Sequence, residues 1–522
     1  MIINDSVMLY SEKMIFALRE LFLEDGFIPY RMSRFEEYDL YANNKEFLIS
    51  DNVITFTGAG GKLMALKPDV TLSIIKNSKD LPEELQKVFY NENVYRYSKE
   101  ADTFKEIMQI GAEIFGRVDT DVICSTILLA AKSLNVLTDD YVIAVSNLDI
   151  LNFLVSKSDD SNCAEEMLRA VSRKNDAYLS EFSGKHEVDV LRKLLQIHGP
   201  VKDAVSEIEK TLESFEGFSN DNSFLKVLSR LSESEFAEKI FVDFSVTDDM
   251  NYYNGTVFKG YVNGVAGAVL SGGQYDKLMK KMGKRSKAVG FGIYTDKLED
   301  ADSKTEKAQA DKDYINIAVP KGRLGKKVFD VFTAAGIKCP TEIDANRKLI
   351  FEDKNSCVRF FWVKPTDVAK YVEKGVADIG VAGKDILLEY EPDVYEISDL
   401  KIGKCNMVVA APKGFCENPN KTLVVATKFE NIATDYYRNL GREIDLIRLN
   451  GSIEVAPILG LSDVIVDIVE TGKTLKENNL EVIDVITDIS ARLIANKTSF
   501  KFKNEAVSKV VAKISEITEE KQ

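Results

Sequence analysis

The chain has 522 residues, of which 45% are hydrophobic and 29% charged, and its formal net charge is −15. This length exceeds what a single hydrophobic core supports, so we expect two to four domains. The acidic balance argues against a general nucleic-acid-binding protein, which needs a broad basic face.

The cysteines and histidines limit the kinds of catalytic and metal-binding chemistry that we expect. Six cysteines are scattered without a CxxC pair, which is typical of reduced thiols in a cytoplasmic protein. Histidine-based acid–base or metal chemistry is not expected, because His186 and His198 are the only histidines. The first residues lack the basic and apolar segments of an export signal, and no apolar stretch is expected to span a membrane.

The first segments of the chain predict helices and strands of a mixed domain. Residues 5–25 carry apolar side chains at helical spacing. A strand-like segment at 53–56 and two longer ones, 88–97 and 108–116, follow. In the last of these, alternation places Gln109 and Glu113 on one face of the strand.

Five polar residues on these segments could together bind a zwitterion: Asp69, Thr71, Arg96, Gln109 and Glu113. Carboxylates would accept hydrogen bonds from an α-ammonium group, and the arginine would bind a carboxylate bidentately. On these residues alone, a solvated polar face of an antiparallel sheet is the more common alternative.

The order of the motifs resembles that of histidyl-tRNA synthetases over residues 5–298. The matching segments are 66–71, 95–97, 109 with 113, 251–258, 271–276 and 288–292. The resemblance implies an α+β, class II synthetase-like N-terminal half, with a helix-rich insertion at 150–240. It also implies a histidine site made by Asp69, Thr71, Arg96, Gln109, Glu113, Tyr253 and Tyr275.

Three arginines of the synthetase pattern are missing. Their positions hold Asp248, Gln274 and Lys297. Formation of an adenylate needs cations around the triphosphate, so the resemblance implies a domain that holds histidine without activating it and has no tRNA partner. An anticodon-binding domain is not expected after residue 298. This combination is similar to the regulatory subunit of short-form ATP phosphoribosyltransferase.

Residues 299–313 are charged and lack apolar periodicity, glycine and proline. They predict a charged linker or a solvated helix between two domains, 1–298 and 314–522.

Downstream of residue 314, strands, tight turns and helix starts recur, as in helix 324–335 closed by Gly336. This recurrence predicts parallel α/β layers with ligands at the carboxyl ends of the strands. Basic residues at these turns suit substrates rich in phosphate, although solvent exposure explains each one taken singly: Lys321, Arg323, Lys384, Lys428 and Lys473.

The segment 462–475 is the most informative stretch of this half. A β-branched run broken only by Asp467 predicts a strand buried on both faces of a parallel sheet. The following Thr-Gly-Lys-Thr, residues 471–474, would present free N–H groups, a helix dipole and two hydroxyls to an anion. Asp467 and Glu470 could accept hydrogen bonds from sugar hydroxyls. The loop is not a Walker A motif, because Asp467 replaces its first glycine; an ordinary threonine-capped turn explains the loop equally well.

This half resembles the catalytic subunit of ATP phosphoribosyltransferase, the first enzyme of histidine biosynthesis, over residues 314–500. The matching segments are 318–324, 377–385, 403–412, 449–457, 462–475 and 489–496. The resemblance implies a two-lobed α/β fold like that of periplasmic binding proteins. Phosphoribosyl pyrophosphate would bind to Asp467, Glu470, Thr471, Gly472, Lys473 and Thr474, and ATP to Lys321, Arg323 and Glu454.

The implied reaction is a direct displacement at the anomeric carbon, with no covalent nucleophile. Mg²⁺ would bind through the leaving pyrophosphate, and no protein ligand is assigned to it. The C-terminal sensing domain of the long-form enzyme is not expected, since about twenty residues follow Phe500.

We therefore expect a cytoplasmic, homo-oligomeric fusion of a regulatory and a catalytic subunit, which associates through both halves. It would transfer phosphoribosyl to ATP and be inhibited by histidine. Two alternatives remain. A working histidyl-tRNA synthetase is opposed by Asp248, and a non-catalytic binding protein is opposed by the intact loop and the missing export signal.

Overall fold

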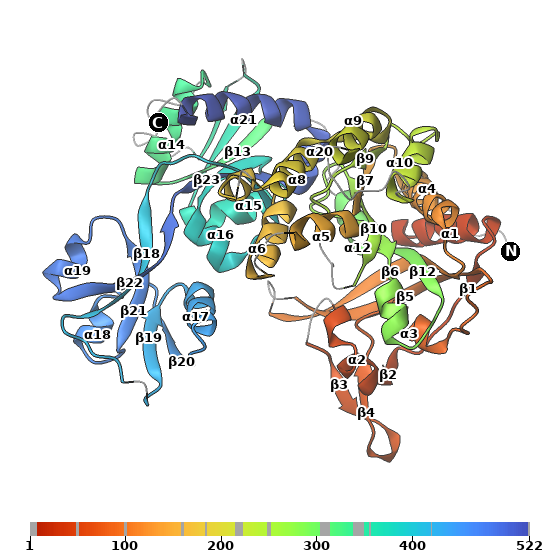
Figure 1. Cartoon of the computed structure of the whole chain (residues 1–522), viewed down its shortest axis with the longest axis horizontal. Helices are drawn as coiled ribbons and strands as arrows, with labels where there is room; N and C mark the ends of the chain where they lie inside the picture. Colours follow the sequence, from red (N-terminus) through yellow and green to blue (C-terminus); the bar gives the residue numbers. More distant parts are fainter. Residues whose placement is uncertain are drawn as a thin grey trace. The chain divides into compact units, whose positions relative to one another are not determined.

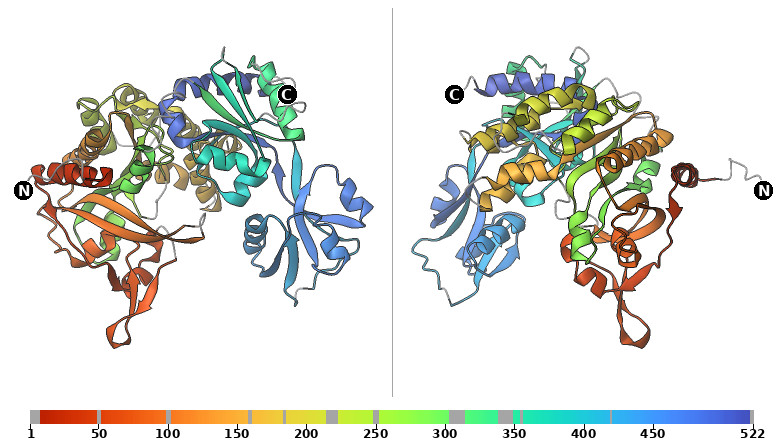
Figure 2. Two further views of the ribbon diagram at one scale, coloured as in Figure 1. Left: turned by 180° about the vertical axis from the view of Figure 1, so that it is seen from behind. Right: turned by 45° about the vertical axis from the view of Figure 1, so that its right-hand side comes forward.

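The computed structural model divides into two compact units, Met1–Lys312 and Asp313–Gln522 (Figures 1 and 2). The residues it describes are 8–48, 52–98, 102–157, 161–182, 185–213, 223–247, 252–302, 314–337, 349–353, 356–418 and 420–519. The predicted linker begins inside a helix, α12 (Thr295–Asp302), and its residues 303–313 lie outside the described part.

Unit 1 is built around a nine-stranded, largely antiparallel sheet of order β1-β5-β6-β12-β11-β10-β7-β9-β8. Its longest hairpin joins β5 (Gln86–Ser98) to β6 (Thr103–Gly116). On the other side of β6, β12 (Lys287–Tyr294) places Gly290 opposite Glu113 and Gly292 opposite Gly111. The remaining strands of this sheet are β1 (Ile28–Pro29), β7 (Tyr141–Asn147), β8 (Gly199–Pro200), β9 (Ile240–Val242), β10 (Asn254–Val262) and β11 (Leu270–Gln274).

A separate three-stranded sheet, β2-β4-β3, lies beside this large sheet in the red part of Figure 1. It consists of β2 (Phe35–Glu37), β3 (Thr55–Thr57) and β4 (Leu63–Leu66), with the short helices α2 (Asp39–Ala42), η2 (Lys45–Phe47) and η3 (Ala59–Gly61) in its connections. The strand predicted at 53–56 thus begins two residues later and ends one residue later.

Helices cover the large sheet. The first, α1 (Tyr10–Glu24), buries Met14, Leu18 and Phe22, which recur every four residues and so share one face. The others next to the sheet are α3 (Thr71–Asn77), α4 (Thr120–Leu137) and α11 (Asp276–Lys281). The predicted helical insertion is present as α5 (Leu148–Ser156), α6 (Ser161–Ser172), α7 (Asp176–Ser180), α8 (His186–Gln196), α9 (Val201–Glu213) and α10 (Ser223–Ser232).

By length and composition alone, α4 is apolar enough to cross a membrane. Half of its residues are buried, among them Ile127, Ala130 and Leu134, which are fully covered. The helix packs against β7, β10 and β12 of the sheet and against α1 and α10. Burial within unit 1 therefore accounts for its composition.

Unit 2 contains two mixed sheets, and we name the parts of the chain around them the six-stranded and the five-stranded subdomain. The six-stranded subdomain has strand order β14-β15-β13-β16-β23-β17. Its elements are β13 (Ile315–Pro320), α14 (Arg323–Ala334), β14 (Ile350–Asp353), β15 (Val358–Val363), η4 (Pro365–Asp367), α15 (Val368–Glu373), β16 (Ile379–Gly383), α16 (Lys384–Tyr390), β17 (Val394–Asp399), β23 (Ala491–Asn496), α20 (Lys497–Phe502) and α21 (Asn504–Glu519).

The five-stranded subdomain has strand order β20-β19-β21-β18-β22. Its elements are β18 (Cys405–Pro412), β19 (Leu423–Thr427), α17 (Glu430–Asn439), β20 (Ile444–Arg448), α18 (Val455–Ile458), β21 (Val464–Val469), α19 (Lys473–Glu477) and β22 (Leu480–Ile489). The chain enters this subdomain between β17 and β18 and leaves it between β22 and β23.

The prediction of parallel layers holds for only part of each sheet. β20, β19 and β21 are parallel, as are β15, β13 and β16. β18 and β23 are antiparallel to their neighbours, so both sheets are mixed. β21 is a central strand whose first three residues are buried, as predicted, but only one of its two neighbours is parallel to it.

Candidate functional site

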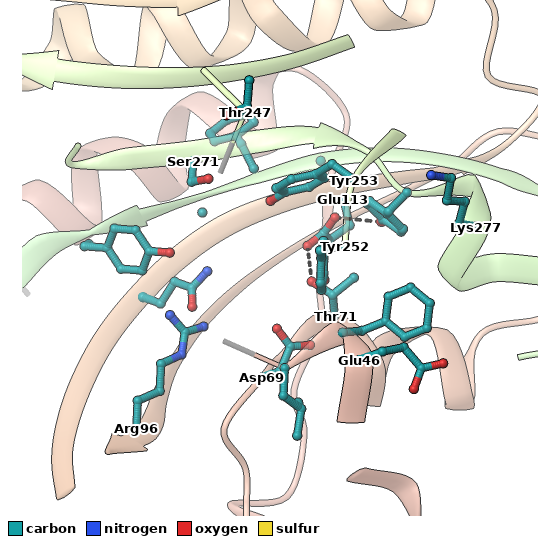
Figure 3. Close-up of a pocket in the computed structure, with 18 of the residues that line it drawn as sticks. Glu46, Asp69, Thr71, Arg96, Glu113, Thr247, Tyr252, Tyr253, Ser271 and Lys277 are labelled. Carbon is teal, nitrogen blue, oxygen red and sulfur yellow. Dashed lines mark hydrogen bonds between the residues drawn. The ribbon is translucent and has the colours of Figure 1, made fainter. Parts of the chain in front are cut away.

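A pocket of about 630 Å³ lies within unit 1. Its walls include all seven residues predicted to bind histidine: Asp69, Thr71, Arg96, Gln109, Glu113, Tyr253 and Tyr275. They come from strands β5 and β6, from the start of α3, and from the residues just before β10 and just after β11, which converge over the sheet (Figure 3). The structure therefore brings together residues that lie up to 206 positions apart.

Glu113 lies at the base of the pocket, where its carboxyl accepts two hydrogen bonds. Thr71 Oγ1 donates to Glu113 Oε1 at 2.9 Å, and Tyr275 OH donates to Oε2 at 2.7 Å. Burial raises the pKa of Glu113 to about 8, against the lowering effect of these two bonds. Gly290 lies opposite on β12, and a Cβ there would stand 1.8 Å from Glu113 Oε2. The glycine thus provides the space in which the carboxyl lies.

Gln109 presents an unused acceptor beside Glu113. Its Nε2 donates to Tyr90 OH at 3.0 Å, while its buried Oε1 has no hydrogen-bond partner in the described structure. Buried polar atoms are nearly always paired, so this oxygen is suited to a donor on a ligand. Gly292 makes room for the amide, since a Cβ there would stand 2.0 Å from Nε2.

Asp69 and Arg96 form the second charged group of the pocket (Figure 3). Burial raises the pKa of Asp69, although a hydrogen bond from Leu72 N at 2.8 Å and the charge of Arg96 oppose this. Arg96 Nε donates to Pro68 O at 2.9 Å, and its guanidinium lies 5.9 Å from the centre of the Tyr294 ring. Part of its donor capacity is therefore already used within the protein.

Several pocket residues were not predicted. Tyr90 on β5 and Tyr294 on β12 line the pocket, as does Tyr252 in the turn before β10, and a further wall comes from the helical insertion. That wall consists of Asn152 on α5 and of Glu165, Leu168, Arg169 and Ser172 on α6. Helical spacing in α6 could have placed its four residues on one face, but nothing in the sequence indicated that this face meets the pocket.

The positions that depart from the synthetase pattern have other roles here. Gln274 Oε1 accepts a hydrogen bond from Thr256 N at 2.8 Å and lies against Gly255. Lys297 Nζ donates to Ala268 O at 2.7 Å. Neither residue lines the pocket, and Asp248 lies outside the described residues.

In unit 2, the predicted phosphoribosyl pyrophosphate loop connects β21 to α19. Gly472 precedes the helix with φ 68°, a conformation that favours glycine. Thr471, Lys473 and Thr474 are exposed, and the N–H groups of the first helical turn have no partners within the helix. The loop thus has the strand–turn–helix geometry expected from the sequence, and anion binding by it stays a prediction.

Charged residues of both subdomains meet beside this loop. Lys428 Nζ lies 3.4 Å from Asp467 Oδ1 and attracts the carboxyl of Asp385 on α16. Burial raises the pKa of both Asp385 and Asp467, and Lys428 opposes the shift in each case. Arg323 of the six-stranded subdomain lies 3.9 Å from Glu470 in an exposed pair. Asp385 was not among the predicted site residues.

The remaining predicted residues are less tightly connected. Glu454, just before α18, is close enough to Asp467 to raise its pKa slightly. Lys473 pairs with Glu477 at 3.7 Å along α19. Lys321 is exposed, and its backbone N–H donates to Val363 O at 2.8 Å.

Two family models match the chain. The model described as "Histidyl-tRNA synthetase" matches residues 8–298, and the model described as "ATP phosphoribosyltransferase" matches residues 364–516. The first match covers more than half of the 522 residues.

Curated relatives named ATP phosphoribosyltransferase are similar to part of the chain. The protein of Brachyspira hyodysenteriae is 56% identical over 204 residues, which are 39% of this chain and 99% of the relative. That of Caldicellulosiruptor bescii is 51% identical over 211 residues, 40% of this chain and 100% of the relative. That of Clostridioides difficile is 50% identical over 206 residues, 39% of this chain and 99% of the relative.

Two solved structures are also similar. The ATP phosphoribosyl transferase (HisG:HisZ) complex from Thermotoga maritima is 39% identical, and the match covers 40% of this chain and 99% of that one, with a TM-score of 0.36. An ATP phosphoribosyltransferase regulatory subunit/histidyl-tRNA synthetase from Bacillus halodurans is 20% identical. The match covers 68% of this chain and 94% of that one, with a TM-score of 0.48.

Unit 1, with its nine-stranded sheet and the match over residues 8–298, has a class II synthetase-like fold. The identities of 50% and more extend over nearly the whole length of the curated relatives. The chain therefore belongs to the histidyl-tRNA synthetase family through residues 8–298 and to the ATP phosphoribosyltransferase family through a C-terminal region that includes residues 364–516.

Proposed function

We propose that the chain is a histidine-regulated ATP phosphoribosyltransferase that carries its sensor and its catalytic centre on one polypeptide. It transfers phosphoribosyl from phosphoribosyl pyrophosphate to N1 of ATP and releases pyrophosphate, the first step of histidine biosynthesis. The observation that carries this proposal is the 56% identity to the Brachyspira hyodysenteriae ATP phosphoribosyltransferase over 99% of that protein.

Unit 2 has the two-lobed architecture of periplasmic binding proteins, and both substrates bind between its subdomains. Basic residues follow the carboxyl ends of β13, β16 and β19, and the phosphoribosyl loop follows β21. Ligands of open α/β sheets bind at such strand ends. The contact of Arg323 with Glu470, and the influence of Lys428 on the pKa of Asp385 in the other subdomain, support this location.

Residues 471–474 bind the 5′-phosphate, and Asp467 and Glu470 accept hydrogen bonds from the ribose. Lys321, Arg323 and Glu454 contact ATP. Orientation of the two substrates and neutralisation of charge lower the barrier for direct displacement, so no covalent nucleophile is needed. Lys428 holds the carboxylate of Asp467 in place until the ribose hydroxyls replace Lys428 as its partner.

Mg²⁺ neutralises charge on the leaving pyrophosphate. Among the described residues, no group of three or more His, Cys, Asp or Glu side chains could hold a metal ion by itself. Mg²⁺ commonly binds substrate phosphates and water together with one or two carboxylates. Asp467 and Glu470 precede the phosphoribosyl loop in the sequence.

Histidine inhibits the enzyme by binding to the pocket of unit 1. Its cationic groups meet Glu113 and Asp69, and the free Oε1 of Gln109 accepts one of its N–H groups. The chain acts in the cytoplasm as a homo-oligomer that associates through both units, and tRNA is not a partner.

The proposal is tested by incubating the purified chain with ATP, phosphoribosyl pyrophosphate and Mg²⁺. We expect pyrophosphate release that requires both substrates and an ATP adduct heavier by one phosphoribosyl group in mass spectrometry. The variant Thr434→Ala, which changes a threonine on α17 and not in the phosphoribosyl loop, is the control for threonine substitutions in that loop and should keep this activity. No adduct from the wild-type chain would refute the proposal.

A histidyl-tRNA synthetase activity is the second candidate, because residues 8–298 match that family. Two positions that hold arginines in the synthetase pattern oppose it. Gln274 carries no charge and binds Thr256 N, and the ammonium of Lys297 is held by Ala268 O. Charging of tRNA with histidine by the purified chain should remain at background, and detectable charging would favour this candidate.

A further inference from the structure

One wall of the histidine pocket is a helix of the insertion. Glu165, Leu168, Arg169 and Ser172 of α6 line the pocket at spacings of three, four and seven residues, which place them on one helical face. The opposite face packs into unit 1 through Met167, Ala170 and Val171, which are at most 5% exposed. The position of the pocket-lining face is therefore fixed by the packing of the insertion.

The base of the pocket cannot neutralise a ligand carboxylate well. It presents Glu113 and Asp69, and the one cation among these residues, Arg96, already faces Asp69, Pro68 O and the Tyr294 ring. A zwitterion therefore directs its cationic groups to the base and its carboxylate away from it. That carboxylate needs a cation on another wall.

Arg169 is the cation best placed for this role. Its side chain is exposed and lines the pocket, and within the described residues no ion pair engages its guanidinium. Ser172 Oγ donates to its backbone oxygen, which leaves the side chain available. Glu165 stands one turn earlier, so this face of α6 carries one anion and one cation, and only the cation can bind a carboxylate. Lys277 also lines the pocket, but it offers a flexible ammonium without the planar fork of arginine.

We propose that Arg169 of α6 binds the α-carboxylate of histidine in this pocket and makes the site specific for the intact amino acid. The inference rests on the proposed function and assigns a residue of the insertion to ligand recognition. Histidine bound in this way connects the sheet, through Glu113, to the insertion, through Arg169. The insertion is thereby the part of unit 1 that responds when histidine is present.

The test compares two ligands by titration calorimetry on the full chain. L-histidine carries the carboxylate, and histamine has the same imidazole and amine without it. The wild-type chain should bind histidine more tightly than histamine. Arg169→Ala should weaken histidine binding about ten- to a hundredfold, the effect of losing a charge-assisted hydrogen bond, and should change histamine binding by no more than about twofold, as expected for a screened charge.

Three variants sharpen the comparison. Arg169→Lys keeps the charge without the fork and should give an intermediate preference for histidine. Arg173→Ala removes an arginine that does not line the pocket, and Lys277→Ala removes the other rim cation. Both should keep the wild-type preference. Thermal unfolding of each variant checks that the fold is retained.

The outcomes separate this inference from the proposed function. A wild-type chain that does not bind histidine would refute the sensor and the inference together. If the wild type binds histidine but Arg169→Ala binds it equally well, the sensor stands and the inference is wrong. Equal losses for histidine and histamine, or loss of the preference in Lys277→Ala, would also overturn it.

Discussion

We expect the wild-type chain to release a proton from Glu113 when histidine binds, and Glu113→Gln to abolish this release. Burial raises the pKa of Glu113 to about 8 from its ordinary value of 4.5. At pH 7 roughly nine-tenths of this carboxyl is therefore protonated before the ligand arrives. A cationic group of histidine within hydrogen-bonding distance favours the carboxylate, so binding expels the proton.

The sign and size of the pH effect follow from this shift. The free site holds more protons than the bound site, so binding strengthens as the pH rises. Between pH 6 and 8 the dissociation constant should fall up to about tenfold per pH unit, equivalent to about 1.36 kcal/mol, and it should level off above about pH 8. The imidazole of the ligand titrates near pH 6.5 in every variant, so the difference between the wild type and Glu113→Gln isolates the contribution of Glu113.

Calorimetry at pH 6.5 in two buffers with different ionisation enthalpies counts the protons released. The wild-type chain should release close to one proton more than Glu113→Gln. Glu46→Gln is the matched control, because Glu46 also lines the pocket but pairs with Lys281 at 2.8 Å and has a lowered pKa. It should retain the wild-type pH slope. Equal proton release in the wild type and Glu113→Gln would refute the protonated state of Glu113.

Three further predictions concern the base of the pocket, the loop and the linker. Gly290→Ala would place a Cβ 1.8 Å from Glu113 Oε2; displacement of the carboxyl should weaken histidine binding at least about tenfold in the same calorimetry, and unchanged affinity would contradict the geometry. Thr471→Ala combined with Thr474→Ala should lower turnover at least about a hundredfold through lost hydrogen bonds to phosphate, with an unchanged circular dichroism spectrum; normal kinetics would eliminate the loop assignment. Cleavage at a protease site near Lys304, outside the described residues, should leave histidine-sensitive activity at high protein concentration and abolish that sensitivity on dilution; a fragment 314–522 that is fully active and histidine-sensitive alone would contradict this division of roles.

Local patterns predicted the elements whose structure depends on nearby residues. The buried face of α1 follows from apolar spacing, and Gly336 ends the helix Arg323–Ala334 with φ 77°, as its sequence predicts. The order of strand directions could not be predicted in the same way. β18 and β23 are antiparallel to their neighbours, and a buried β-branched strand has the same sequence pattern beside either kind of neighbour.

The pocket likewise contains residues that the sequence predicted and residues whose position depends on tertiary packing. Motif order predicted Asp69, Thr71, Gln109 and Glu113 together, and the structure places them around one cavity. The wall formed by α6 was not predicted, since its position depends on how the insertion packs against a sheet whose strands come from distant parts of the chain. In unit 2, Asp385 was missed because its proximity to Lys428 requires contact between the two subdomains.

The central claim is that the synthetase-like pocket controls the phosphoribosyl transfer of the same chain. It is tested most directly by a histidine titration of that reaction with the wild type and with Gln109→Ala and Glu113→Ala. The wild type should be inhibited, and both variants should remain active at histidine concentrations that inhibit it, since coupling energies of about 1–3 kcal/mol are easily seen in such a titration. Full inhibition of both variants would place the regulatory histidine site elsewhere and contradict the claim.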